Sequence, residues 1–206
     1  MIDRASFAAA WHELGAAGDA ADMHRRLVAC WSEKHRHYHT LQHLRECLEH
    51  VATSRGQMQR PAEVVTALWF HDAFYDVRRD DNEKRSAEWA RDAAAAAGVP
   101  PASIQRVYDM VMATANHMPQ HDGDAQLLVD IDLTIFGAPA ARFAESNDQV
   151  RREYAHVPEP QWRVGRKRML QGFLDRPRLY CTDRFHAMFE ERARENIAGE
   201  LARLTG

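Results

Sequence analysis

Apolar residues recur along this chain at spacings of three and four residues, which is the period of an amphipathic α-helix. Three such faces follow one another near the start: Phe7, Trp11 and Leu14; Met23, Leu27 and Trp31; and Leu41, Leu44, Leu48 and Val51. No segment alternates apolar and polar residues for long enough to predict a β-strand. The pattern therefore predicts an all-α protein.

Proline, aspartate and glycine interrupt the later part of the pattern and mark the ends of further helices. These helices are expected from Pro61 to Trp69, from Asp80 or Asp81 to Gly98, from Pro101 to Val111, from Leu127 to Ile131, over 139–155, over 161–174 and from Phe185 to Leu204. The stretch from Asn116 to Asp124 is expected to be a polar loop. Without a repeat or a low-complexity linker, we expect about nine or ten helices in a single domain over residues 1–206.

The composition is typical of an ordinary soluble globular protein, because 45% of the 206 residues are hydrophobic and the net charge is only −3. No basic stripe favours a nucleic acid polymer as partner. The apolar runs are far shorter than the roughly 20 residues of a membrane span, and the N-terminus lacks the features of a secretory signal. Cys30, Cys47 and Cys181 form no CxxC pair, so we expect a reduced, cytoplasmic protein with its cysteines in the core.

Histidines and aspartates interrupt the apolar faces of three segments. They are His39 and His43 in RHYHTLQHL, His71 and Asp72 in ALWFHDAFYD, and Asp130 and Asp132 in LLVDIDLTIFG. The two histidines are four residues apart and can share one helical face. Burying an ionised carboxylate is costly unless it is paired or binds a metal, and imidazole with carboxylate suits a divalent ion. The sequence therefore predicts one ion held by three separate helices.

Eight segments carry a resemblance to a known family. They are YHTLQHL (38–44), ALWFHDAFYD (67–76), DDNEKRSAEWA (80–90), ATANH (113–117), DIDLTIFG (130–137), RREY (151–154), VGRKRML (164–170) and ARENIAGEL (193–201). Their order, with His, His-Asp and Asp in succession, resembles the HD superfamily of metal-dependent phosphohydrolases. The match goes beyond the bare signature, because the chain looks like a group of small bacterial proteins described as predicted members of that superfamily, and the resemblance spans nearly the whole chain.

This resemblance implies a set of metal ligands: His43, His71, Asp72 and Asp132. Asp132 is preferred to Asp130 because the last ligand of the superfamily usually precedes a leucine. His39 then becomes a substrate-binding residue, although His39 or Asp130 in place of a named ligand stays open. The ion can be Mn, Fe, Co, Ni, Zn or Mg, and there is room for a second metal.

The remaining site residues follow from the expected hydrolysis, in which a bound ion activates water and polarises a phosphoryl oxygen. Glu83 is the candidate general acid/base, and Asp72 counts as catalytic as well as ligating. Candidate phosphate contacts, beside His39, are His117, Arg36, Arg85, Arg151 and Arg166. Structural alternatives stay open. Glu83 could form a capping box with Asp80, Arg151 and Arg166 could pair with Glu153 or Glu195, and His117 and His121 could be exposed in the polar loop.

The expected function is a metal-dependent phosphohydrolase acting on a small phosphate ester, with a nucleotide as one candidate and mono- or diesterase action unresolved. One alternative is an HD-type di-iron oxygenase. Its second ion would need further histidines, and Asn82 and Glu83 stand where the first of them would fall. Another alternative is a non-catalytic module that binds a nucleotide. A homodimer is compatible with the sequence.

Overall fold

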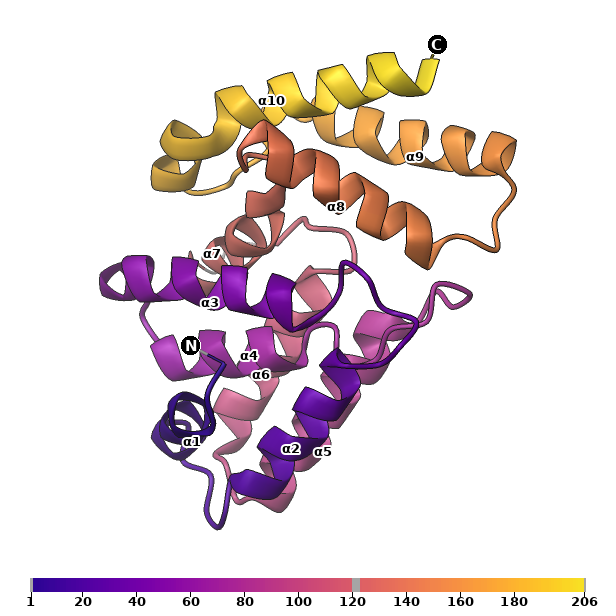
Figure 1. Cartoon of the computed structure of the whole chain (residues 1–206). Helices are drawn as coiled ribbons and strands as arrows, with labels where there is room; N and C mark the ends of the chain where they lie inside the picture. The colour runs from indigo at the N-terminus through magenta and orange to yellow at the C-terminus, as the bar shows by residue number, and fades with distance from the viewer. Residues whose placement is uncertain (1, 120–122, 206) are drawn as a thin grey trace. The chain divides into compact units, whose positions relative to one another are not determined.

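The computed structural model describes residues 2–119 and 123–205, and within these ranges the chain is helical without a strand. The helices are α1 (Arg4–Glu13), α2 (Ala21–Trp31), α3 (Leu41–Ser54), η1 (Arg55–Gln57), α4 (Pro61–Phe70), α5 (Asn82–Ala96), α6 (Pro101–Ala113), α7 (Gly123–Asp132), η2 (Leu133–Ile135), α8 (Ala140–Glu153), α9 (Glu159–Leu174) and α10 (Asp183–Thr205). The prediction of an all-α fold is confirmed (Figure 1).

The chain divides into two compact units, residues 1–131 and 132–206. The boundary falls one residue before the end of α7. The first nine residues of this helix belong to the first unit, and its last residue, Asp132, is the first residue of the second unit. The expectation of one domain over the whole chain stays a prediction.

Helix α4 lies at the centre of the first unit. It contacts α1, α3, α5 and α6, and Figure 1 shows α3 running beside it. Every residue from Ala62 to Phe70 is buried, so the helix is covered on all sides rather than on one stripe. Pro61 occupies the first turn, where its missing N–H costs no hydrogen bond. A helix buried on every side fixes the position of whatever follows its last turn.

Aromatic rings pack around α4 and supply much of its burial. The ring of Phe7 lies 5.1 Å from that of Trp69, and Trp89 meets Phe70 edge-on at 5.3 Å. Such pairs add about 0.5–1.5 kcal/mol to the free energy of burying their area. The packing therefore holds α1 and α5 firmly against the central helix.

Asp124 ties the start of α7 to the start of α4. Its two carboxylate oxygens accept hydrogen bonds from the backbone N–H groups of Gln59 and Arg60, each at 2.8 Å. The polar loop expected up to Asp124 was wrong at its end, because α7 already begins at Gly123. An acidic side chain in a first helical turn is favourable, and this one also satisfies donors just ahead of α4.

The start of α5 differs from the expected cap. Asp81 stands at the N-cap position, but its carboxylate binds the guanidinium of Arg79 at 2.6 and 2.7 Å and makes no capping bond. The side chain of Asn82, the first residue of α5, bonds to the loop after α4. It accepts from the N–H of Asp76 at 3.1 Å and donates to the Asp76 carbonyl at 2.9 Å. The first turn of α5 is thereby fastened to the loop after α4.

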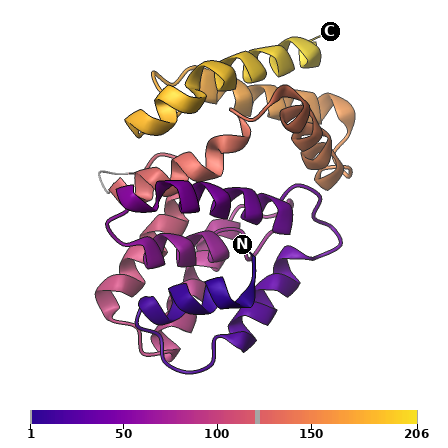
Figure 2. The ribbon, with the colours of Figure 1, turned by 60° about the vertical axis from the view of Figure 1, so that its left-hand side comes forward.

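The second unit contains α8, α9 and α10, which Figure 2 shows at the C-terminal end of the colour scale. Glu190 of α10 accepts from the N–H groups of Leu179 and Tyr180, and the Tyr180 hydroxyl donates to the carbonyl of Leu133 at 3.0 Å. A Cβ on Gly137 would lie 2.7 Å from the Cβ of Phe189, so only glycine permits this close approach.

The three cysteines do not share one environment. Cys47 is buried, Cys30 is half-buried and Cys181 is exposed. The expectation that all three are core residues was therefore wrong for Cys181, which lies in the turn before α10.

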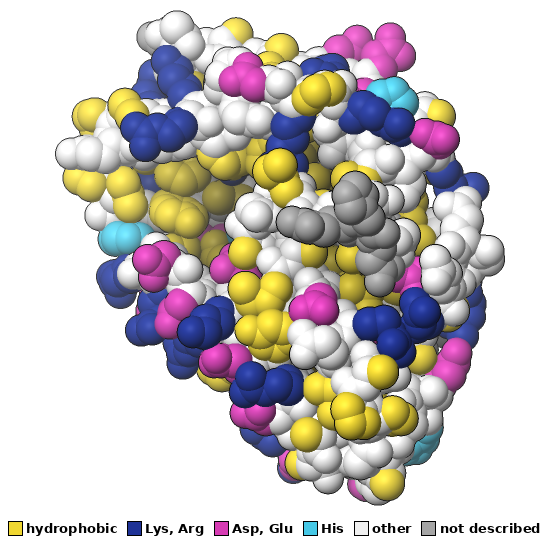
Figure 3. All heavy atoms as spheres, turned by 180° about the vertical axis from the view of Figure 1, so that it is seen from behind, with side chains coloured by type: hydrophobic (Ala, Val, Ile, Leu, Met, Phe, Trp, Pro, Cys, Tyr) yellow, Lys and Arg dark blue, Asp and Glu magenta, His cyan; other side chains and the backbone are white. Residues whose placement is uncertain are grey.

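On the face in Figure 3, the described basic and acidic side chains are interspersed rather than gathered into a basic surface. Among the described helices, none has both the length and the apolar character to span a bilayer.

Candidate metal centre

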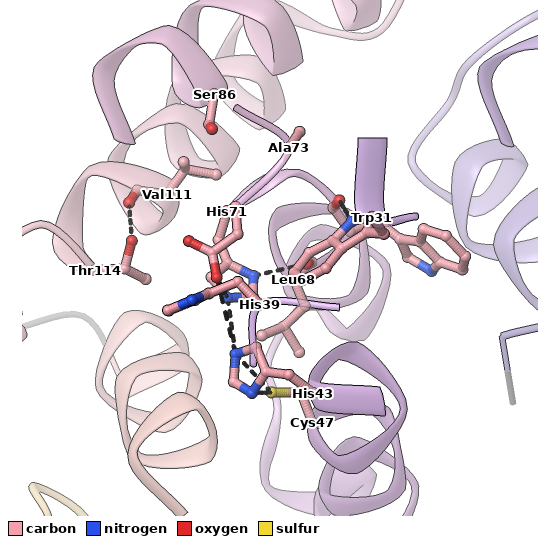
Figure 4. A network of polar contacts seen from close by, with 12 residues as sticks. Trp31, His39, His43, Cys47, Leu68, His71, Ala73, Ser86, Val111 and Thr114 are labelled. Atoms are coloured by element: carbon pink, nitrogen blue, oxygen red, sulfur yellow. Dashed lines mark hydrogen bonds and ion pairs between the residues drawn. The ribbon is translucent and has the colours of Figure 1, made fainter. Parts of the chain in front are cut away.

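His43 enters the site from the first turn of α3. The helix begins after Thr40, whose hydroxyl accepts from the N–H of Gln42 at 3.3 Å. His39 lies ahead of this cap, so the expectation that it shares a helical face with His43 was wrong. His43 is only 3% exposed, and the sulfur of Cys47, one turn along, lies 3.8 Å from its ring nitrogens (Figure 4).

His71 follows directly after α4 and is 1% exposed. Its Nδ1 lies 2.8 Å from the carbonyl oxygen of Leu68, as the dashed line in Figure 4 marks. A carbonyl only accepts, so Nδ1 must carry the proton and the lone pair is left on Nε2. This contact fixes the tautomer that a metal ligand needs, as is common for ligating histidines.

Three donor atoms converge between α3 and the end of α4. The Nε2 atoms of His43 and His71 are 3.3 Å apart. Oδ2 of Asp72 lies 3.1 Å from Nε2 of His71 and 3.9 Å from Nε2 of His43. Two ligand atoms about 2.1 Å from one ion, at an angle between a right angle and the tetrahedral angle, lie roughly 3.0–3.4 Å apart. The two imidazoles therefore already have the separation of ligands that share an ion.

Asp132 completes the group from the last position of α7. One ligand atom each from His43, His71 and Asp132 lie within 4.8 Å of one another, so these residues could hold a metal ion. Asp130 is fully buried and is not part of this group. Imidazole with carboxylate suits Mn, Fe, Co, Ni or Zn, and the donor set fits the expected divalent ion.

Arg36 is buried, and its guanidinium is engaged by the protein itself. It donates to the carbonyls of Asp72 at 2.6 Å and Ala73 at 3.0 Å, and to the carboxylate of Glu33 at 2.9 Å. These contacts do not support the expected role as a phosphate contact, because the donors already have partners.

His39 and His117 lie outside the metal group. The ring of His39 stacks on Tyr75, with centroids 4.0 Å apart and planes 28° from parallel. His117 is half-buried just after α6 and has a φ of 51°, in the left-handed region. The substrate-binding role of both residues stays a prediction. His121, the companion of His117 in the expected loop, lies outside the described residues.

Glu83 is half-buried in the first turn of α5. In the described part of the chain its side chain forms no hydrogen bond or ion pair, and it makes no capping box with Asp80. Arg85, on the same helix, places its guanidinium 4.4 Å from the ring centroid of Phe74. The capping box with Asp80 is therefore not formed, although Glu83 keeps the first-turn position in which an acid favours the helix dipole. The catalytic role of Glu83 stays a prediction.

Arg151 and Arg166 belong to the second unit and have structural partners there. Arg151 pairs with Glu159 at 3.0 Å and donates to the carbonyls of Tyr154 and Val157, while Arg166 donates to Asn147 at 2.6 Å. Pairing was foreseen as the alternative to phosphate binding, although with other partners than Glu153 and Glu195.

Sequence reasoning missed two neighbours of the ligands, Cys47 and Trp31. The indole of Trp31 lies 5.4 Å from the ring of His71 and bonds through its N–H to the carbonyl of Trp69 at 3.0 Å. The i+4 spacing of Cys47 from His43 was a signal that could have found it. Trp31 is distant in sequence and gave no such signal.

Comparison of the chain with models of protein families, with curated proteins and with solved structures found no match.

Proposed function

We propose that this protein is a metal-dependent phosphohydrolase of the HD type, which cleaves a small phosphate ester with the help of one divalent ion. The observation that carries the proposal is the buried group formed by His43, His71 and Asp132, with Asp72 beside both histidines. The order of these residues along the chain resembles that of the HD superfamily, so geometry and sequence agree on His43, His71 and Asp132. Asp72 is added from the resemblance and from its distances to the two histidines.

The ion, when bound, would supply an activated water and a Lewis acid for a phosphoryl oxygen. His43, His71, Asp72 and Asp132 would hold it. His71 is presented as a neutral ligand because the Leu68 carbonyl keeps the proton on Nδ1. Burial of both imidazoles would strengthen the interactions of the carboxylates with a bound ion.

Glu83 is the residue that would move the proton. Ser86, one turn further along α5, accepts from the N–H of Phe74 at 3.0 Å, so this helix is fixed to the segment just after Asp72. Glu83 lies three residues before Ser86, on the same side of the helix. Its carboxylate, which no other side chain engages, could take a proton from water or give one to the leaving oxygen.

The direct test is a panel of phosphomonoesters and phosphodiesters, including nucleotides, assayed with Mn²⁺, Co²⁺, Ni²⁺, Zn²⁺, Fe²⁺ and Mg²⁺. We expect turnover with at least one pairing of ester and metal, and none in Asp72→Ala. Arg106→Met serves as the control, since Arg106 pairs with Glu63 at the start of α4 rather than at the site. Activity retained in Asp72→Ala would refute the proposal.

The same purified protein also tests the two alternative functions, the di-iron oxygenase and the non-catalytic nucleotide-binding module. Two tightly held irons per chain and uptake of oxygen would favour the di-iron oxygenase. Binding of a nucleotide without turnover of any ester would favour the non-catalytic module. Either result would replace the phosphohydrolase as the function of this chain.

A further inference from the structure

We propose that Arg36 is a positioning residue, which sets the geometry of the metal ligands before any ion binds. The inference rests on the proposed metal centre. In this role Arg36 does not bind phosphate. It joins the segment that leads into α3 to the segment that follows α4.

Each nitrogen of the Arg36 guanidinium has a partner within the protein. Nε donates to Glu33 at 2.9 Å, and Nη2 donates to the carbonyl of Ala73 at 3.0 Å. Nη1 donates to the carbonyl of Asp72 at 2.6 Å and, more weakly, to that of His39 at 3.4 Å. The side chain has no exposed area, so a phosphate group could reach it only by breaking these bonds.

The carbonyl contacts join the two segments that carry the ligands. Asp72 is itself a proposed ligand, and its backbone is held by the shortest bond that Arg36 makes. His39 precedes His43 by four residues, on the way into α3. One cation therefore fixes the backbone on both sides of the 3.3 Å gap between His43 and His71.

Ring contacts extend the same link. The guanidinium carbon lies 5.4 Å from the ring centroid of Tyr75 and 5.7 Å from that of Trp31. Tyr75 stacks on His39, and Trp31 packs against His71. Arg36 thus contacts the ring that stacks on His39 and the ring that packs against His71.

The physical chemistry favours arginine over any other cation here. A buried guanidinium without partners would be strongly destabilising, but its planar fork can serve several carbonyls and a carboxylate at once. A lysine ammonium offers one point of attachment and cannot span the same set. The inference therefore predicts that both Arg36→Lys and Arg36→Met disturb the ligands.

The test is a titration of the metal-free protein with Co²⁺, followed by visible absorption, which reports affinity and coordination geometry together. The variants are Arg36→Lys and Arg36→Met. The matched control is Arg106→Met, which also removes an arginine that binds a carboxylate through two nitrogens, here Glu63. Far-ultraviolet circular dichroism checks that each metal-free variant is folded.

We expect both Arg36 variants to bind Co²⁺ about 10- to 100-fold more weakly than the unchanged protein, which is the usual effect of losing a residue that orients metal ligands. Their absorption bands should also shift. Arg106→Met should keep the affinity within about twofold, since distant sites act independently. If Arg36→Met does not fold, Arg36→Lys decides the question.

A folded Arg36 variant with the Co²⁺ affinity and spectrum of the unchanged protein would overturn the inference. So would an equal loss of affinity in Arg106→Met, which would indicate general destabilisation. Failure of the proposed function looks different, because the unchanged protein would then bind Co²⁺ through the same ligands but hydrolyse no ester.

Discussion

The imidazoles of His43 and His71 face each other through nitrogen atoms 3.3 Å apart. Because Nδ1 of His71 donates to Leu68, its Nε2 can accept a hydrogen bond from the N–H of His43 when no ion is bound. An ion would take the place of that proton, so metal binding should release it.

Glu83 gives the sharpest prediction at the scale of one residue. Glu83→Gln keeps the size of the side chain but removes its ability to exchange a proton. We expect kcat to fall by roughly 10²–10⁴-fold, as for other general acids and bases. Metal affinity and thermal stability should stay unchanged, because the side chain has no partner to lose in the described part of the chain.

Steady-state kinetics and a metal titration on the same sample check this. A Glu83→Gln variant with full kcat would exclude Glu83 as the general acid/base and would make His117 the next candidate for that role.

At the scale of elements, Asp124 joins the start of α7 to the residues just ahead of α4. Asp124→Asn is nearly isosteric, but its amide nitrogen cannot accept from the N–H of Gln59 or Arg60. Losing one such charge-assisted bond should reduce the free energy of unfolding by about 1.5–3 kcal/mol. Metal affinity should fall as well, since the far end of α7 carries a ligand.

Urea unfolding and a metal titration test this expectation. Lower stability with unchanged metal affinity would mean that the end of α7 is positioned without Asp124.

A second element-scale prediction concerns Glu190 and the turn before α10. Burial alone would raise the pKa of Glu190, but hydrogen bonds from the N–H of Leu179, from Arg194 and from the N–H of Tyr180 outweigh it and lower the pKa below its ordinary 4.5. A lowered folded-state pKa contributes stability that is present above the unfolded-state pKa and is lost as the pH falls through the folded-state value.

Glu190→Gln should therefore be less stable than the unchanged protein at neutral pH, by about 1–3 kcal/mol. The difference should shrink as the pH falls below about 4. Urea midpoints measured from neutral pH to about pH 3 would show the two curves converging. A difference that stays constant over this range would contradict the assignment.

At the scale of the whole molecule, the helices were predictable because their faces are periodic. The expected segments all appear as helices, including α4 with Pro61 in its first turn. The cap of α5 was predicted less well, since Arg79 competes for the carboxylate of Asp81. Local sequence cannot weigh such a competition, because it depends on where the loop places both side chains.

That His43, His71 and Asp132 come together was predictable for a different reason. A histidine or aspartate inside an apolar segment is costly, so its presence indicates a compensating partner. The supports around the ligands could not be predicted in this way. Arg36 reaches carbonyls 36 and 37 residues away, and Asp124 reaches backbone groups 64 and 65 residues away. Contacts of this range follow from the packing of helices and leave no periodic signal.

The proposed function requires one divalent ion that is coordinated by side chains from α3, the end of α4 and the end of α7. The most direct test of this requirement is calorimetric titration of the metal-free protein with Mn²⁺, comparing Asp132→Asn with Asp130→Asn. The two aspartates are two residues apart on one helix, and only Asp132 belongs to the metal group. The account predicts one ion per chain in the unchanged protein, none in Asp132→Asn and one in Asp130→Asn. Absence of binding by the unchanged protein, or undiminished binding by Asp132→Asn, would contradict it.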